Sequence, residues 1–267
     1  MINVKDVSKS FEDVKALDDV NINIRKGTIY GLVGTNGSGK TTLLKHVTGI
    51  LRQDEGQITV DGVPVYENIP YKEKMGFISD ELFFFGNFNL NDMSKLYSGL
   101  YSSWDQVRFD SIVKSFKLRK NVKISRFSKG MQKQAAFALV MSVRPDYLIL
   151  DEPVDGLDPL ARRTVWDLIV NDVAARDMTV LISSHNLKEI EGICDTVGIL
   201  SGGKVALERD LDALKSEVHK IQAAFRKKPD CCYDGLNILS EERIGSVDML
   251  IAKNTIEEIK QVFNELD

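Results

Sequence analysis

The chain has 267 residues, which allows one large domain or one domain with a small appendage. It is 43% hydrophobic and 28% charged, as ordinary globular proteins are, and its apolar runs fall far short of the roughly 20 residues that span a bilayer. The net charge of −4 provides no basic field for nucleic acid, so we expect no nucleic-acid partner.

The cysteines and the N-terminus indicate a reducing compartment. An odd count of cysteines with two of them adjacent argues against a disulfide framework: Cys194, Cys231 and Cys232. The first residues are polar and charged in alternation, without the apolar segment of a signal peptide. The three histidines are too scattered to suggest a metal site.

Strands and helices alternate along the first 212 residues. Strands are predicted at 2–11, 17–24, 29–33, 57–60, 147–150, 179–185 and 197–200. Helices are predicted after the loop that ends at 41 as far as about 50, across most of 90–144, and at 164–175 and 187–194. Asp61-Gly62 is typical of a hairpin turn. This alternation predicts an α/β core with a mainly parallel sheet.

The pattern changes past Ala213. Strands are predicted at 218–225, 236–244 and 247–252, and an amphipathic helix at 255–266. The apolar stripe of that helix comprises Ile256, Ile259, Val262, Phe263 and Leu266. We therefore expect a small α+β accessory module over 213–267, either regulatory, dimer-supporting or a passive cap, after a larger α/β domain over 1–212.

A glycine-rich loop follows the apolar run 29–33 and precedes a helix. It reads Gly34, Thr35, Asn36, Gly37, Ser38, Gly39, Lys40 and Thr41, the phosphate-binding pattern G-x-x-x-x-G-K-[ST]. The glycines let successive backbone amides wrap a phosphate chain, and the helix adds its positive end. Lys40 supplies charge for the β- and γ-phosphates, and the hydroxyl of Thr41 suits Mg²⁺. The loop predicts nucleotide binding.

Two acids close the apolar run 147–150. Asp151 and Glu152 therefore stand at the carboxyl end of a buried parallel strand, where open α/β sheets bind ligands. Asp151 is suited to hold Mg²⁺ through water, since that ion prefers oxygen ligands. The adjacent Glu152 should point elsewhere, toward the γ-phosphate.

With these motifs the chain resembles the nucleotide-binding subunit of ABC transporters over about residues 2–212. In the family's order, the phosphate loop extends to Thr42, and the segment 127–132 (Phe-Ser-Lys-Gly-Met-Gln) resembles the family signature. The acid pair, a D-loop at 156–158 and a switch histidine, His185, follow. The resemblance implies a P-loop ATPase with an antiparallel N-terminal β subdomain and a helical subdomain over about 82–145, using ATP and Mg²⁺.

The resemblance also implies roles for single residues. Glu152 polarises the attacking water as general base. His185 contacts the γ-phosphate, to which Lys40 also supplies charge, and the D-loop of the partner subunit; a structural histidine is the alternative. Phe11 matches the aromatic residue that stacks on adenine; a core phenylalanine is the alternative. The signature residues face the ATP of a second subunit, so that each nucleotide is held between two chains. These residues are Ser128, Lys129, Gly130 and Met131.

The sequence departs from the family pattern in two places. Lys129 replaces a glycine of the signature, and Met131 stands where glutamine is usual. Asp80 replaces the glutamine that senses Mg²⁺ and couples the site to the membrane subunit; Asp80 remains a candidate Mg²⁺ ligand, and Glu81 is the alternative. The phenylalanine-rich run 83–88 that follows is either core packing or the floor of a groove for a membrane subunit.

The predicted function is an ATP-hydrolysing subunit that drives translocation, most consistent with export, through a separate polytopic permease. We expect it to pair with a second ATP-binding subunit, identical or different, at the cytoplasmic face of the membrane. The alternative is an ABC-type ATPase of translation or DNA repair; such proteins usually carry two cassettes or a long coiled-coil insertion, and neither is visible here. A GTPase would need a base-reading N-K-x-D motif, which the sequence lacks.

Overall fold

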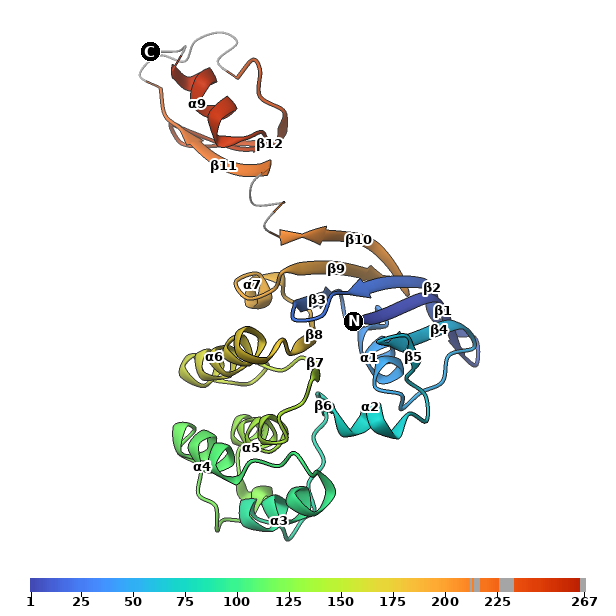
Figure 1. Cartoon of the computed structure of the whole chain (residues 1–267). Coiled ribbons are helices and arrows are strands. Elements are labelled where there is room, and N and C mark those ends of the chain that lie inside the picture. The colour runs from blue at the N-terminus through green and yellow to red at the C-terminus, as the bar shows by residue number, and fades with distance from the viewer. Residues whose placement is uncertain (212, 214–216, 226–232, 265–267) are drawn as a thin grey trace. The chain divides into compact units, whose positions relative to one another are not determined.

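The computed structural model describes residues 1–211, 213, 217–225 and 233–264 (Figure 1). The chain divides into two compact units, Met1–Glu208 and Arg209–Asp267. The division falls slightly before the border expected after residue 212, inside the last strand of the first unit's sheet. Each unit is described by itself.

A mainly parallel sheet forms the centre of the first unit. Its described strands are ordered β10-β9-β3-β8-β7-β6. They comprise β3 (Ile29–Val33), β6 (Met75–Ile78), β7 (Tyr147–Asp151), β8 (Thr179–Ser184), β9 (Thr196–Ser201) and β10 (Lys204–Asp210). The pairs from β9 through β3, β8 and β7 to β6 are all parallel. Every residue of β7 and β8 is buried, as the unbroken apolar runs predict for strands covered on both faces.

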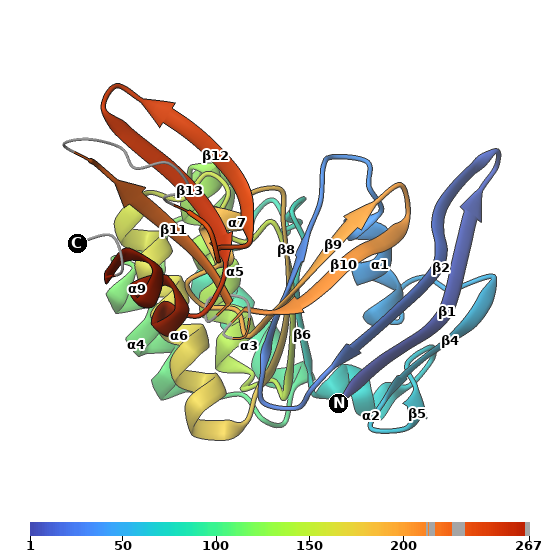
Figure 2. The same cartoon turned by 90° about the horizontal axis from the view of Figure 1, so that it is seen from above.

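A second, antiparallel sheet has the order β2-β1-β4-β5. It contains β1 (Ile2–Phe11), β2 (Val14–Ile24), β4 (Glu55–Val60) and β5 (Val63–Pro64). The turn at Asp61-Gly62 joins β4 to β5, as predicted. Alternate apolar residues of β1 and β2 point into a core that they share with α1 (Lys40–Val47). In Figure 2, α1 lies on the same side of the parallel sheet as this second sheet.

The opposite side of the parallel sheet is covered by α5 (Lys129–Ser142), α6 (Pro159–Arg176) and the short α7 (Leu187–Ile190), as both views show. Helices α3 (Leu90–Leu100) and α4 (Gln106–Ser115) pack beside α5, and a 3₁₀ turn (Ile124–Arg126) precedes it. Helix α6 begins earlier than the predicted residue 164. The reason is local: Asp158 caps the helix and Pro159 occupies its first position.

Three elements were not predicted. Strand β6 is a four-residue segment that gains its hydrogen bonds from β7, and α2 (Ile69–Glu73) is a single short helix capped by Asn68. Strand β10 returns beside β9 after the Gly202-Gly203 turn. Apart from these additions, the α/β class with a mainly parallel sheet is confirmed.

The second unit contains a small antiparallel sheet of order β11-β13-β12. Its elements are β11 (Val218–Ala223), β12 (Ile238–Ile244), β13 (Val247–Lys253) and α9 (Ile256–Asn264), close to the predicted ranges. Leu250 and Ala252 are buried in its interior, and Tyr233 donates a 2.7 Å hydrogen bond to the buried Asp248. The predicted helix end at Leu266, and Cys231 and Cys232, lie outside the described residues.

Candidate nucleotide site

The phosphate loop joins β3 to α1, as the sequence predicts. Gly39 has a φ of 106°, and a Cβ there would lie 2.5 Å from the carbonyl oxygen of Ala16. A Cβ at Gly34 would lie 2.4 Å from the carbonyl oxygen of Leu200. Only glycine fits both positions. No side chain caps the start of α1, so its first amides remain available to an anion.

The ammonium group of Lys40 is buried inside the loop. Its Nζ donates to the carbonyl oxygens of Gly34 at 2.8 Å and Thr35 at 3.2 Å. The same Nζ lies 3.5 Å from Oε1 of Glu152. The amide of Ser38 closes the loop by donating to the carbonyl oxygen of Thr35 at 3.2 Å. The loop thus holds a positive charge at its centre.

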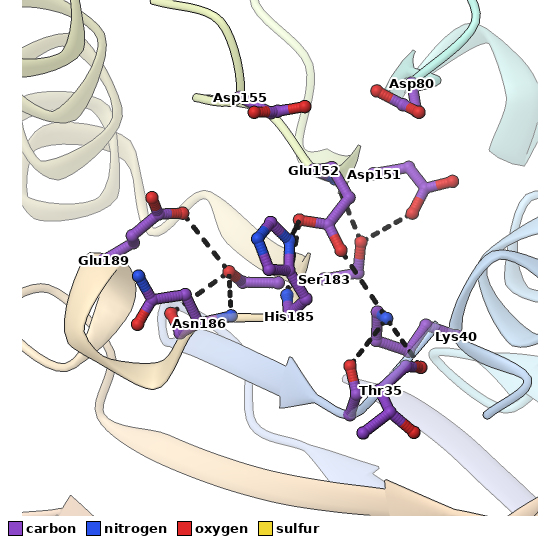
Figure 3. A network of polar contacts seen from close by, with 12 residues as sticks. Thr35, Lys40, Asp80, Asp151, Glu152, Asp155, Ser183, His185, Asn186 and Glu189 are labelled. Atoms are coloured by element: carbon purple, nitrogen blue, oxygen red, sulfur yellow. Dashed lines mark hydrogen bonds and ion pairs between the residues drawn. The ribbon is translucent and has the colours of Figure 1, made fainter. Parts of the chain in front are cut away.

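Asp151 and Glu152 point in different directions, as Figure 3 shows. Asp151, only 1% exposed, accepts hydrogen bonds from Oγ1 of Thr41 at 2.7 Å and from Oγ of Ser183 at 2.6 Å. Glu152 has a φ of 45°, in the left-handed region that a non-glycine residue seldom adopts. Its amide donates to Oγ of Ser183 at 3.0 Å. Ser183 therefore supports both acids, although it belongs to no motif visible in the sequence.

His185 lies on the far side of the Glu152 carboxylate from Lys40 (Figure 3). Its Nδ1 is 2.9 Å from Oε2 of Glu152, and its amide donates to the same oxygen at 3.3 Å. The hydrogen bond to Glu152 and the negative charge of that carboxylate raise the pKa of His185 above its ordinary value. One carboxylate thus lies between the loop ammonium and the predicted switch histidine.

A cavity of about 500 Å³ opens over the phosphate loop. The phosphate loop and the start of α1 provide the largest share of the lining of this cavity. The remaining residues are Asp80, Glu152, the start of β2 and the turn between β9 and β10. The residues are Val14, Lys15, Ala16, Asn36, Gly37, Gly39, Lys40, Thr41, Thr42, Asp80, Glu152, Gly202 and Gly203.

Phe11 is not part of this lining. Its exposed ring lies under the ammonium of Lys9, with Nζ 5.4 Å from the ring centroid. The apolar wall of the cavity comes from Val14 and Ala16 on β2, which belong to no motif visible in the sequence. The alternative that Phe11 is a core residue is wrong, because its side chain is exposed, and stacking of Phe11 on adenine stays a prediction.

The signature segment lies outside the cavity over the phosphate loop. Ser128 caps α5, and its Oγ accepts a hydrogen bond from the amide of Met131 at 3.2 Å. Ser128 and Lys129 are exposed, and Lys129 lines a second cavity of about 480 Å³ together with Asp80 and Gly156. Gly130 lies close to the carbonyl oxygen of Gly156, which a Cβ would approach to 2.9 Å.

The oxygen atoms beside the loop fit Mg²⁺. The Thr41 hydroxyl and the Asp151 carboxylate are hard ligands, and Mg²⁺ usually combines one or two such groups with water and substrate phosphates. Among the described residues there is no group of three or more histidine, cysteine or acidic side chains that would hold a metal alone. Asp80 lies at the cavity wall, with Oδ1 3.5 Å from Nζ of Lys133.

A strand, a glycine loop, a helix N-terminus, a central ammonium and an acid pair at the end of β7, which β8 separates from β3, together define a P-loop nucleotide-binding protein. Comparison with known proteins then gives the family. Residues 17–155 match the ABC transporter family, to which the chain belongs. It is 32% identical to the ABC transporter ATP-binding protein YtrB of Bacillus subtilis, over the whole chain and 91% of that relative.

Other relatives and solved structures agree with this family. The bacitracin transport ATP-binding protein BcrA of Bacillus licheniformis is 32% identical over 82% of the chain and 73% of that relative. A solved ATP-binding subunit of an ABC transporter superposes with a TM-score of 0.74 and 26% identity, covering 80% of this chain and 92% of that one. A dimeric bacterial cassette, at 22% identity and a TM-score of 0.72, covering 79% of this chain and 99% of that one, shares the fold.

The chain is therefore the ATP-binding subunit of an ABC transporter, and ATP hydrolysis is its expected reaction. The alternative of a translation or repair ATPase is not supported by these relatives. No helix in the described ranges is both long enough and apolar enough to cross a bilayer.

Proposed function

We propose that this subunit powers export of an amphiphilic molecule through a separate polytopic membrane subunit, as a peripheral protein on the cytoplasmic face. The names of its relatives support export: one serves bacitracin transport and another, SrtF of Streptococcus pyogenes, at 30% identity over 85% of this chain and all of that relative, lantibiotic transport. The observation that carries the proposal is a complete phosphate loop and acid pair, together with a signature segment that lies outside the cavity over that loop.

Within the site, we assign binding of the β- and γ-phosphates to the loop amides and Lys40. Thr41 and Asp151 would hold Mg²⁺, which supplies charge neutralisation to the phosphates when bound. Glu152 accepts a proton from the attacking water, because its carboxylate lines the cavity, whereas the carboxylate of Asp151 is hydrogen-bonded to Thr41. His185 orients that carboxylate from its other side.

The working unit we propose is a dimer that holds each nucleotide between two chains. Its basis is the exposure of Ser128 and Lys129 at the start of α5, outside the cavity of their own phosphate loop. A second chain, identical or different, would receive this helix N-terminus, whose dipole and Ser128 hydroxyl favour an anion.

An exposed aromatic patch is our candidate contact for the membrane subunit. Phe83 is 81% exposed, and its ring centroid lies 5.7 Å from that of Phe85, which in turn lies 4.9 Å from that of Phe88. The alternative that Phe83 and Phe85 are core residues is wrong, because both are exposed. Such a patch fits the apolar face of a partner helix, and it begins three residues after Asp80.

Two experiments test the proposal. Glu152→Gln should still bind ATP, lose hydrolysis and accumulate as an ATP-bound dimer in size-exclusion chromatography; turnover at the wild-type rate would remove the base assignment. A tagged chain should also co-purify with a polytopic membrane protein from native membranes. Phe83→Asp should abolish that association while leaving ATP hydrolysis intact, with Val107→Asp, at another exposed apolar residue, as the matched control.

The second unit we propose to be an accessory module that is not needed for ATP binding. It has its own sheet, helix and buried interior. A chain truncated after Leu211 should fold and bind ATP, while its dimer lifetime or its coupling to the permease changes. An insoluble truncated chain would show that the module is part of the ATPase.

A further inference from the structure

A buried lysine on the signature helix contacts the main chain of the catalytic acid. Lys133 is 6% exposed and lies just over one turn into α5. Its Nζ donates to the carbonyl oxygen of Glu152 at 2.7 Å and to that of Asp155 at 3.2 Å, and lies 3.5 Å from Oδ1 of Asp80. An ammonium group has three donors, and each has an acceptor here.

These contacts fix Glu152 from both ends. Its amide is held by Ser183 and its carbonyl oxygen by Lys133. The residue between these two anchors has the left-handed backbone that side chains seldom adopt, and it persists only where the surroundings impose it. That backbone directs the carboxylate between Lys40 and His185.

Lys133 does not belong to the nucleotide cavity, because it lines the second cavity beside Asp155 and Gly156. Asp80 lines both cavities and stands between them. The carboxylate of Asp80 therefore serves as the counter-ion of a buried ammonium, which a protein interior requires. Lys133 and Asp80 together join three segments: α5, the loop that follows β6 and the turn that follows Glu152.

We propose that Lys133 is a positioning residue for hydrolysis: it holds the main chain of Glu152 so that the carboxylate faces the cavity, and it ties that acid to the helix that carries the signature segment. The inference rests on the proposed general-base role of Glu152. A shift of α5 in the dimer would then move the catalytic acid of the same chain through one side chain.

The test compares Lys133→Gln and Lys133→Arg with Lys95→Gln, a control at an exposed lysine of α3, in the full-length chain. For Lys133→Gln we expect kcat to fall about tenfold to hundredfold, the loss that misplacing a catalytic group causes. The Kd for a fluorescent ATP analogue without Mg²⁺ should stay within about threefold, because ground-state binding does not involve Lys133. Lys133→Arg keeps the charge and should retain more of kcat than Lys133→Gln.

Hydrogen exchange supplies a measurement that does not depend on turnover. In the nucleotide-free chain, amides 154–157 should exchange faster in Lys133→Gln and at the wild-type rate in Lys95→Gln. Faster exchange with a wild-type kcat would reduce Lys133 to a structural role, and equal losses in kcat and affinity would place it in binding; either result overturns the proposal.

Lys133→Arg and Glu152→Gln keep the test decisive. If Lys133→Gln does not fold, Lys133→Arg decides, since its planar fork cannot reproduce all three contacts: a folded Arg variant with wild-type kcat would overturn the proposal. Glu152→Gln, measured alongside, separates the two ideas. A fully active Glu152→Gln variant would refute the general-base role of Glu152. An inactive Glu152→Gln variant together with a fully active Lys133→Gln variant would refute only the positioning role of Lys133.

Discussion

Replacing Ser183 by alanine should damage both acids of the site at once. The Ser183 hydroxyl is fully buried, donates to Oδ1 of Asp151 at 2.6 Å and accepts from the amide of Glu152 at 3.0 Å. A hydrogen bond to a charged group contributes about 1.5–3 kcal/mol, and a buried amide left without a partner costs about 1–3 kcal/mol. Together these give a loss of roughly 3 kcal/mol or more in the free energy of unfolding.

The neighbouring Ser184 provides a matched control. It is equally buried on β8, but its hydroxyl accepts from the amide of Asn186 at 3.0 Å and lies near the carbonyl oxygen of Asn186 at 3.1 Å and Oε2 of Glu189 at 3.4 Å, without a contact to Asp151 or Glu152. Both alanine variants should therefore lose stability in chemical denaturation followed by circular dichroism. Only Ser183→Ala should also lose about tenfold to hundredfold in kcat, because both acids shift.

The reasoning fails if Ser183→Ala keeps wild-type stability and kcat. It also fails if the two variants lose kcat equally, because the loss would then follow from weakening β8 in general. Raising Mg²⁺ should restore part of the activity of Ser183→Ala, since a misplaced Asp151 weakens metal binding rather than removing a ligand.

Three further results are expected. An NMR titration of His185 in the nucleotide-free chain should give a pKa above the ordinary value of about 6.5, and Glu152→Gln should lower that pKa. Because the pKa is raised in the folded chain, the His185–Glu152 pair stabilises the fold at pH values below the ordinary pKa. This stabilisation is lost as the pH rises through the raised pKa. An unchanged titration in Glu152→Gln would separate the two residues. Asp80→Gln should lower the Mg²⁺ needed for nucleotide binding by up to about fivefold, since a half-exposed charge contributes at most roughly 1 kcal/mol; an unchanged requirement would mean that the carboxylate does not act on the metal. Gly130→Ala should lower kcat with little change in melting temperature, because better helix propensity offsets the approach of the new Cβ to 2.9 Å from the Gly156 oxygen; a wild-type kcat would show that the 155–157 turn yields freely.

Local chemistry was readable from the sequence because it depends on neighbouring residues. The phosphate loop is a contiguous segment between an apolar strand and a helix, so its place and conformation follow from its own glycines. The acid pair likewise follows its strand directly. The predicted strands of the second unit were also correct, because alternation and the Gly245 turn are local signals.

The sequence alone determined the class of protein and most of the nucleotide-binding residues, whereas the tertiary structure decided which side chains support them. The sequence separation explains the difference: Thr41 and Asp151 meet across 110 positions, and Ser183 reaches Asp151 only because β7 and β8 pair in parallel with these two residues side by side. The roles of Lys133 and of Val14 in the apolar cavity wall could not be predicted from the sequence for the same reason. Their partners are chosen by the order of strands and the packing of α5, which no local pattern of residues records.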